Sequence, residues 1–108
     1  MMDLKWNRKF ALEQTDGDSA LLDELITLFK ESAASDFLQL KEAVADRNAT
    51  AIIAAAHSLK GASASLGIEG IREIAYEIET AARNNTLENI ASHIPDMENL
   101  VQQLQEIE

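Results

Sequence analysis

The chain of 108 residues contains no cysteine, one proline and four glycines. Without cysteine, disulfide bonds and thiolate metal sites are excluded, and the redox compartment cannot be inferred. The scarcity of proline and glycine leaves few positions that would end a helix. No segment has the alternation of apolar and polar residues that is typical of a strand. We therefore expect a protein that is helical almost throughout.

Basic residues are also scarce: 9 Lys and Arg stand against 19 Asp and Glu, for a formal net charge of −10. Nucleic acids and anionic membrane surfaces are bound by clustered basic residues, which this chain lacks. No apolar run approaches the roughly 18 residues of a membrane-spanning helix, and the N-terminus has no signal-peptide core. We expect a soluble, cytoplasmic protein with no nucleic acid or membrane partner.

Apolar residues recur at spacings of three and four along most of the chain, which is typical of amphipathic helices. Two helices are predicted over about 4–13 and about 19–47. A third begins near Ala49 and ends at a C-terminal glycine, Gly67. A fourth ends at 84–85, and Thr86 can cap the last one. Pro95 should kink or break the last helix. Short loops force neighbouring helices to run antiparallel. The prediction is an all-α protein with one domain over 1–108, an up-down-up-down four-helix bundle with a short N-terminal capping helix.

One histidine interrupts a run of small residues, AAHSLKGASASLG at 55–67. On a helix with about 100° per residue, His57 lies roughly 140° from the apolar stripe that contains Ile52 and Leu59. The imidazole should therefore face the solvent. Gly61, one turn further on, costs a helix about 1 kcal/mol relative to alanine. Such a local cost indicates a functional reason for leaving this position bare.

The neighbours of His57 on its face of the helix are small, apart from one cation. Ala54, Gly61 and Ala64 should give an incoming group steric access, and Lys60 can stabilise a phosphoryl group as a point charge. The pattern favours an imidazole nucleophile over which the active site of another protein closes. A solvated surface lysine is the alternative interpretation of Lys60.

An apolar docking patch is predicted beside this histidine. Antiparallel pairing places His57 level with residues 34–38 of the second helix. Ala34, Leu38 and Ile53 lie off the core stripes, and together with Ala64 they are predicted to receive the partner. Each can equally be an isolated exposed apolar residue.

These residues carry a resemblance to a known family. The motif consists of His57-x-x-Lys60-Gly61 and Leu66-Gly67, with Ile78-Glu79 and Arg83-Asn84-Asn85 in the following helix. From about residue 19 to the C-terminus, the chain resembles the histidine phosphotransfer (HPt) domain of bacterial multistep phosphorelays. The resemblance implies that His57 accepts a phosphoryl group from an aspartate of one receiver domain, in a hybrid sensor kinase, and passes it to an aspartate of another, in a response regulator. It implies a monomer without a cofactor, since the receiver supplies Mg²⁺.

The sequence has no glycine-rich phosphate loop and no kinase signature, so we expect no kinase activity and no ATP site. Two alternatives stay open: a phosphoacceptor domain of the chemotaxis-kinase type, served by an ATP-binding domain of the same protein, and a structural helical bundle. A metal site is disfavoured because neither His57 nor His93 follows a glutamate by three residues. The doubled methionine at the start fits a module excised from a larger hybrid kinase.

Overall fold

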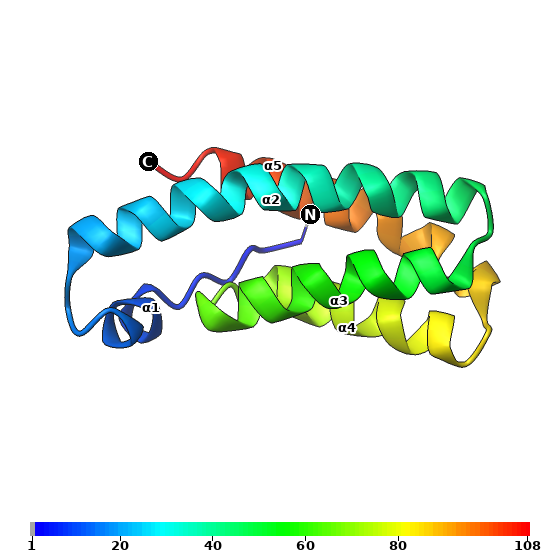
Figure 1. The fold of residues 1–108 in the computed structure, drawn as a ribbon, viewed down its shortest axis with the longest axis horizontal. Coiled ribbons are helices and arrows are strands. Elements are labelled where there is room, and N and C mark those ends of the chain that lie inside the picture. The colour runs from blue at the N-terminus through cyan, green and yellow to red at the C-terminus, as the bar shows by residue number, and fades with distance from the viewer. Residues whose placement is uncertain (1) are drawn as a thin grey trace.

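The computed structural model describes residues 2–108 and contains five α-helices and two short 3₁₀ turns (Figure 1). In chain order these are α1 (Arg8–Gln14), α2 (Ser19–Ala45), α3 (Ala49–Ser65), α4 (Glu69–Arg83), η1 (Leu87–Asn89), η2 (Ala91–His93) and α5 (Ile94–Gln105). The β-pairing within the described residues is limited to one isolated bridge, between Trp6 and Ile68. The all-α prediction is confirmed.

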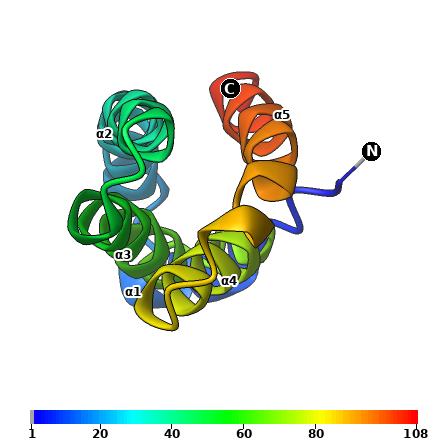
Figure 2. The same ribbon diagram turned by 90° about the vertical axis from the view of Figure 1, so that its right-hand side faces the viewer.

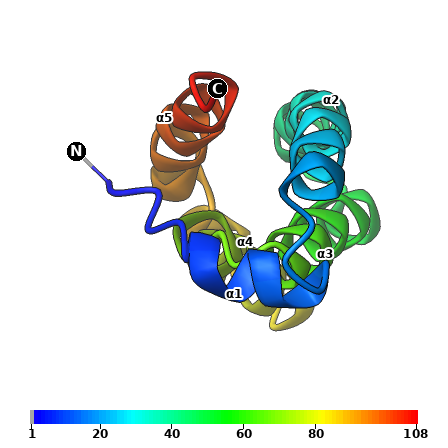
Figure 3. The same ribbon diagram turned by 90° about the vertical axis from the view of Figure 1, so that its left-hand side faces the viewer.

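Helices α2, α3, α4 and α5 alternate in direction along the long axis of the molecule (Figure 1). The two end-on views show them following one another around the bundle, with α1 across the end where α2 begins and α3 ends (Figures 2 and 3). This is the predicted up-down-up-down arrangement with its N-terminal cap. In the part of the chain that the structure describes, no helix is long and apolar enough to cross a membrane.

The core lies along the apolar stripes of the four long helices. The stripe of α3 is buried as predicted, and so is most of that of α2; the buried residues of these two helices are Leu22, Ile26, Phe29, Ala33, Phe37, Leu40, Ala43, Ile52, Ala55, Ala56, Leu59 and Ser63. Across the α2–α3 interface, Ser58 Oγ donates a hydrogen bond of 2.6 Å to Asp36. That contact confirms the predicted register, with the middle of α3 level with residues 34–38.

The N-terminal segment differs from the prediction, because α1 begins at Arg8 and not near residue 4. Residues 2–7 are not helical, and two of their carbonyls accept hydrogen bonds from α4, whose first turn has no side-chain cap. Leu4 O accepts from Gly70 N at 2.8 Å, and Lys5 O accepts from Glu69 N at 3.2 Å. These bonds satisfy amides that a helix N-terminus leaves unpaired. A distant segment thus caps α4, and helical periodicity carries no signal for that.

The last part of the chain is broken close to Pro95, as predicted. Two 3₁₀ turns precede α5, and Pro95 lies in its first turn, where a missing amide hydrogen costs nothing. Thr86 does not cap this segment with its side chain; its hydroxyl donates instead to Ala81 O, 3.0 Å away. Gly67 follows α3 with a φ of +69°, which agrees with its prediction as a C-terminal glycine.

Candidate functional site

His57 lies in the middle of α3 with 65% of its side chain exposed. The predicted solvent-facing orientation is therefore confirmed. Its ring is held on one side only: Nδ1 lies 3.3 Å from Oε2 of Glu79, on α4. The opposite ring nitrogen, Nε2, has no hydrogen-bond partner among the described residues.

Glu79 is the centre of this site, although its side chain is only 5% exposed. Arg83 donates to Oε2 from Nη2 at 2.6 Å and from Nε at 3.0 Å. Lys60 Nζ lies 2.7 Å from Oε1 and forms an ion pair with it. One buried carboxylate thus gathers His57, Lys60 and Arg83 from two helices.

The charge of Glu79 decides which nitrogen of the neutral histidine ring carries the proton. Burial raises the pKa of Glu79, but the contacts with Lys60, Arg83 and His57 outweigh it and lower that pKa from 4.5 to about 2. The carboxylate is therefore ionised at neutral pH and can only accept hydrogen bonds. A hydrogen bond between His57 and Glu79 consequently requires the proton on Nδ1, which leaves the lone pair of the neutral ring on the exposed Nε2.

Glu79 belongs to the family motif, but its place in the site was not predicted. A signal was present in the sequence, because Glu79 follows Ile78 and stands one helical turn from the small apolar residues Ala75 and Ala82. A glutamate in such a stripe is rarely buried without a partner. What periodicity could not supply is the identity of that partner.

Lys60 is in the site as predicted, but it is not a free surface lysine. Its side chain is 29% exposed, pairs with Glu79 and lies over the ring of Tyr76, with Nζ 5.8 Å from the ring centroid. A phosphoryl group on His57 would therefore compete with Glu79 for this cation. Its role in holding phosphate stays a prediction.

The small residues form the open surface around the imidazole. A Cβ added at Gly61 would meet nothing within 4 Å, and Gly61 is not among the glycines with positive φ. Neither packing nor backbone conformation within this chain therefore requires glycine there. Ala54 is exposed and Ala64 is partly buried. A requirement for space must come from a partner.

The residues of the predicted docking patch do not all share one face. Ile53 and Ala64 are partly buried and lie within about 40° of His57 on α3. Ala34 and Leu38 are exposed, Leu38 by 57%, but each is two residues from Asp36 and hence roughly 160° around α2 from it. Because Asp36 faces α3, Ala34 and Leu38 point away from the helix that carries His57. The geometry separates them from this site.

The other histidine lies apart from this cluster. His93 is partly buried in η2, and its Nδ1 is 3.6 Å from Glu77 Oε2. Over residues 2–108, no group of three His, Asp or Glu side chains is placed to hold a metal ion.

A sequence model of the Hpt domain matches residues 24–107. The chain belongs to the Hpt domain family. It is 21% identical over 100 residues to the phosphorelay intermediate protein rdeA of Dictyostelium discoideum, a match that covers 93% of this chain and 39% of that protein. The chain thus spans well under half of that relative. The fold resembles the crystal structure of the HPT domain of a sensor hybrid histidine kinase from Shewanella, with a TM-score of 0.78, 21% identity, and 96% and 94% of the two chains covered.

Membership in this family confirms the resemblance carried by the motif. In this Hpt domain the site combines one anion, Glu79, with two cations, Lys60 and Arg83. Its fixed charges therefore sum to a positive value, in a chain with a net charge of −10. Such a local surplus favours an anionic group on the neighbouring imidazole.

Proposed function

We propose that Nε2 of His57 is the phosphoacceptor of this Hpt domain. The observation that carries the proposal is the exposed imidazole whose Nδ1 faces a buried, ionised carboxylate. This arrangement presents one nitrogen lone pair to the solvent in a fixed direction, and it leaves space around that nitrogen for the active site of a receiver domain.

The transfer step needs no proton movement within this chain. Nε2 of the neutral ring attacks the phosphorus of an aspartyl phosphate, the N–P bond forms and the P–O bond to the aspartate breaks, so that the aspartate leaves as a carboxylate. The Nδ1 proton stays in place, and Glu79 balances the positive charge that the ring acquires. Transfer to the aspartate of a second receiver is the reverse of this step. Lys60 would move from Glu79 toward the phosphoryl oxygens.

The remaining roles belong to the partners. We expect the donor to be a receiver domain of a hybrid sensor kinase and the acceptor a receiver domain of a response regulator. Mg²⁺ would be bound by the receiver, and this chain would contribute position and electrostatics without a cofactor, an ATP site or kinase activity of its own. It would work in the cytoplasm as a monomer.

The test is incubation of the chain with a receiver domain phosphorylated on its aspartate. We expect one labelled site, stable in alkali and labile in acid as a phosphoramidate is, and no label on His57→Gln. Because His57 is exposed, that variant should keep the circular dichroism spectrum of the wild type. His93→Gln is the matched control and should label normally. Undiminished labelling of His57→Gln would refute the proposal.

A further inference from the structure

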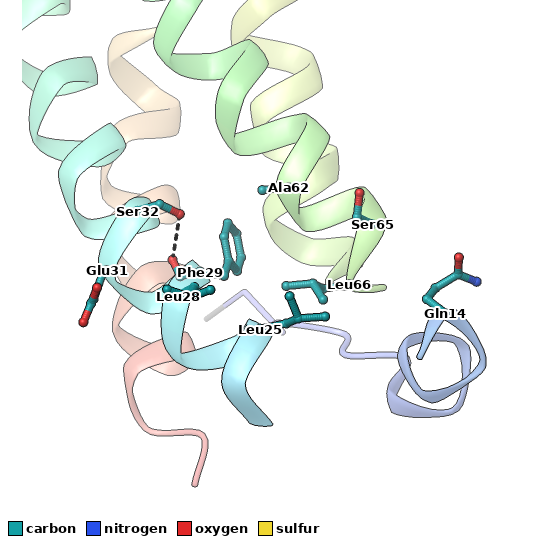
Figure 4. Close-up of a pocket in the computed structure, with 9 residues that line it drawn as sticks. All are labelled: Gln14, Leu25, Leu28, Phe29, Glu31, Ser32, Ala62, Ser65 and Leu66. Carbon is teal, nitrogen blue, oxygen red and sulfur yellow. Dashed lines mark hydrogen bonds between the residues drawn. The ribbon is translucent and has the colours of Figure 1, made fainter. Parts of the chain in front are cut away.

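Helix α3 has different surroundings on its two sides. Toward α2 it borders an apolar groove (Figure 4), which is lined by Leu25, Leu28, Phe29, Ala62 and Leu66. Toward α4 it faces the carboxylate of Glu79 and one aromatic side chain, Tyr76. Tyr76 is the single tyrosine of the chain, and it is 56% exposed. Burial in the core therefore does not explain its position.

Tyr76 lies opposite Lys60 in the same register that places Glu79 opposite His57. Lys60 is three residues after His57 on α3, and Tyr76 is three residues before Glu79 on α4. Because the two helices run antiparallel, a step forward on α3 matches a step back on α4, about 4.5 Å in each case. Lys60 Nζ accordingly lies 5.8 Å from the centroid of the Tyr76 ring, in the range of a cation–π contact. The ammonium group thus contacts both the ring and the carboxylate of Glu79.

These two contacts of Lys60 differ in what phosphorylation does to them. In the resting state the buried carboxylate of Glu79, 2.7 Å away, fixes the ammonium group with or without the ring. A phosphoryl group on the exposed Nε2 of His57 draws Lys60 away from Glu79 and toward the solvent. There an ion pair is screened by water and restrains a long side chain only weakly. The contact with the exposed ring of Tyr76 persists, because a cation–π attraction does not depend on one bond angle.

We infer that Tyr76 is a positioning residue of the phosphorylated state: its ring keeps Lys60 within reach of the phosphoryl group after the ammonium group has left Glu79. The inference rests on the proposed function and adds to the site a residue that stands outside the motif. It also gives the exposed ring a role that depends on its face and not on its hydroxyl group.

A competition between two histidines tests this role at equilibrium. Wild type is phosphorylated with phosphoramidate, which needs no partner. It is then mixed with an equal amount of an unphosphorylated variant and a trace of the receiver domain used in the labelling assay. The receiver carries phosphoryl groups in both directions until each chain holds a constant share, which mass spectrometry measures. We expect Tyr76→Leu to hold about two- to fivefold less phosphate than wild type, the effect of losing an exposed cation–π contact.

Three variants assign the effect to the ring and to Lys60. Tyr76→Phe keeps the ring and should share the phosphate evenly with wild type. Phe10→Leu is the matched control, because it removes another exposed ring, on α1, and it should also share evenly. Between chains that both carry Lys60→Ala, Tyr76→Leu should make no difference, since no ammonium group is left to position. Because Tyr76 is exposed, all variants at this position should keep the circular dichroism spectrum of the wild type.

The final shares do not depend on how the receiver docks, which changes only the time needed to reach them. An even share for Tyr76→Leu would overturn the inference. So would an equal deficit for Tyr76→Phe, or a deficit of Tyr76→Leu that persists when both chains carry Lys60→Ala. If phosphoramidate fails to label His57 of the wild type, it is the proposed function that fails. A labelled wild type that shares evenly with Tyr76→Leu refutes the role of Tyr76 alone.

Discussion

Replacing Glu79 by Gln changes the charge at the centre of the site and little else. The glutamine carbonyl can still accept from Nδ1 of His57, but the ion pairs with Lys60 and Arg83 are lost. Lowering the pKa of Glu79 from 4.5 to about 2 corresponds to about 3 kcal/mol of folding stability at neutral pH. Lys60 and Arg83 are 29% and 56% exposed and regain water in the variant. We therefore expect Glu79→Gln to lower the free energy of unfolding by about 1–3 kcal/mol.

The pH dependence gives this prediction a direction. The pKa of Glu79 is lower in the folded chain than in the unfolded chain. The contribution of Glu79 to the free energy of unfolding is therefore complete above about pH 4.5 and is lost as the pH falls toward 2. Urea unfolding followed by circular dichroism at pH 7, 5, 4 and 3 measures the difference between wild type and Glu79→Gln. The other acidic residues are common to both proteins and largely cancel in that difference. A difference that stays constant from pH 7 to pH 3, or is absent at pH 7, would refute the assigned role of Glu79.

The same substitution separates the orientation of the ring from its charge balance. Glu79→Gln should still be phosphorylated on His57, because an acceptor for Nδ1 remains. Glu79→Ala removes that acceptor, and we expect labelling by the phosphorylated receiver to slow by about tenfold or more. Equal rates for Glu79→Ala and wild type would mean that the contact with Nδ1 does not orient the nucleophile.

Three further predictions concern Lys60 and two glycines. Lys60→Ala should slow transfer or change the lifetime of phosphorylated His57 several-fold without abolishing labelling, and Lys60→Arg should keep most of the function; a wild-type rate and lifetime for Lys60→Ala at low salt would remove Lys60 from the site. Gly61→Gln should block transfer to the receiver while circular dichroism shows unchanged helicity; transfer at the wild-type rate would refute steric access. Gly61→Ala should raise Tm, because it adds up to about 1 kcal/mol of helix stability. Gly70→Ala should lower Tm, because the new Cβ would lie 2.5 Å from Asp3 O. Equal shifts of Tm in thermal unfolding would contradict this contrast.

The helices and the exposure of the nucleophile could be predicted from the sequence, because both depend on local periodicity. Spacings of three and four mark the buried side of each helix, and His57 lies on the opposite side of α3 from that stripe. Gly67 and Pro95 act on their own backbone, so their effects on the ends of α3 and α5 could also be predicted.

Only the tertiary packing decided which residues of other elements contact each helix. Glu79 is 22 residues from His57 along the chain, and only the pairing of α3 with α4 brings its carboxylate to the imidazole. The cap on α4 comes from Leu4 and Lys5, more than 60 residues before it. Ala34 and Leu38 were predicted beside His57 from their level along the bundle, but the rotation of α2 about its own axis turns them away. Periodicity specifies the buried side of a helix, whereas the opposing element and the rotation follow from how all the helices pack together.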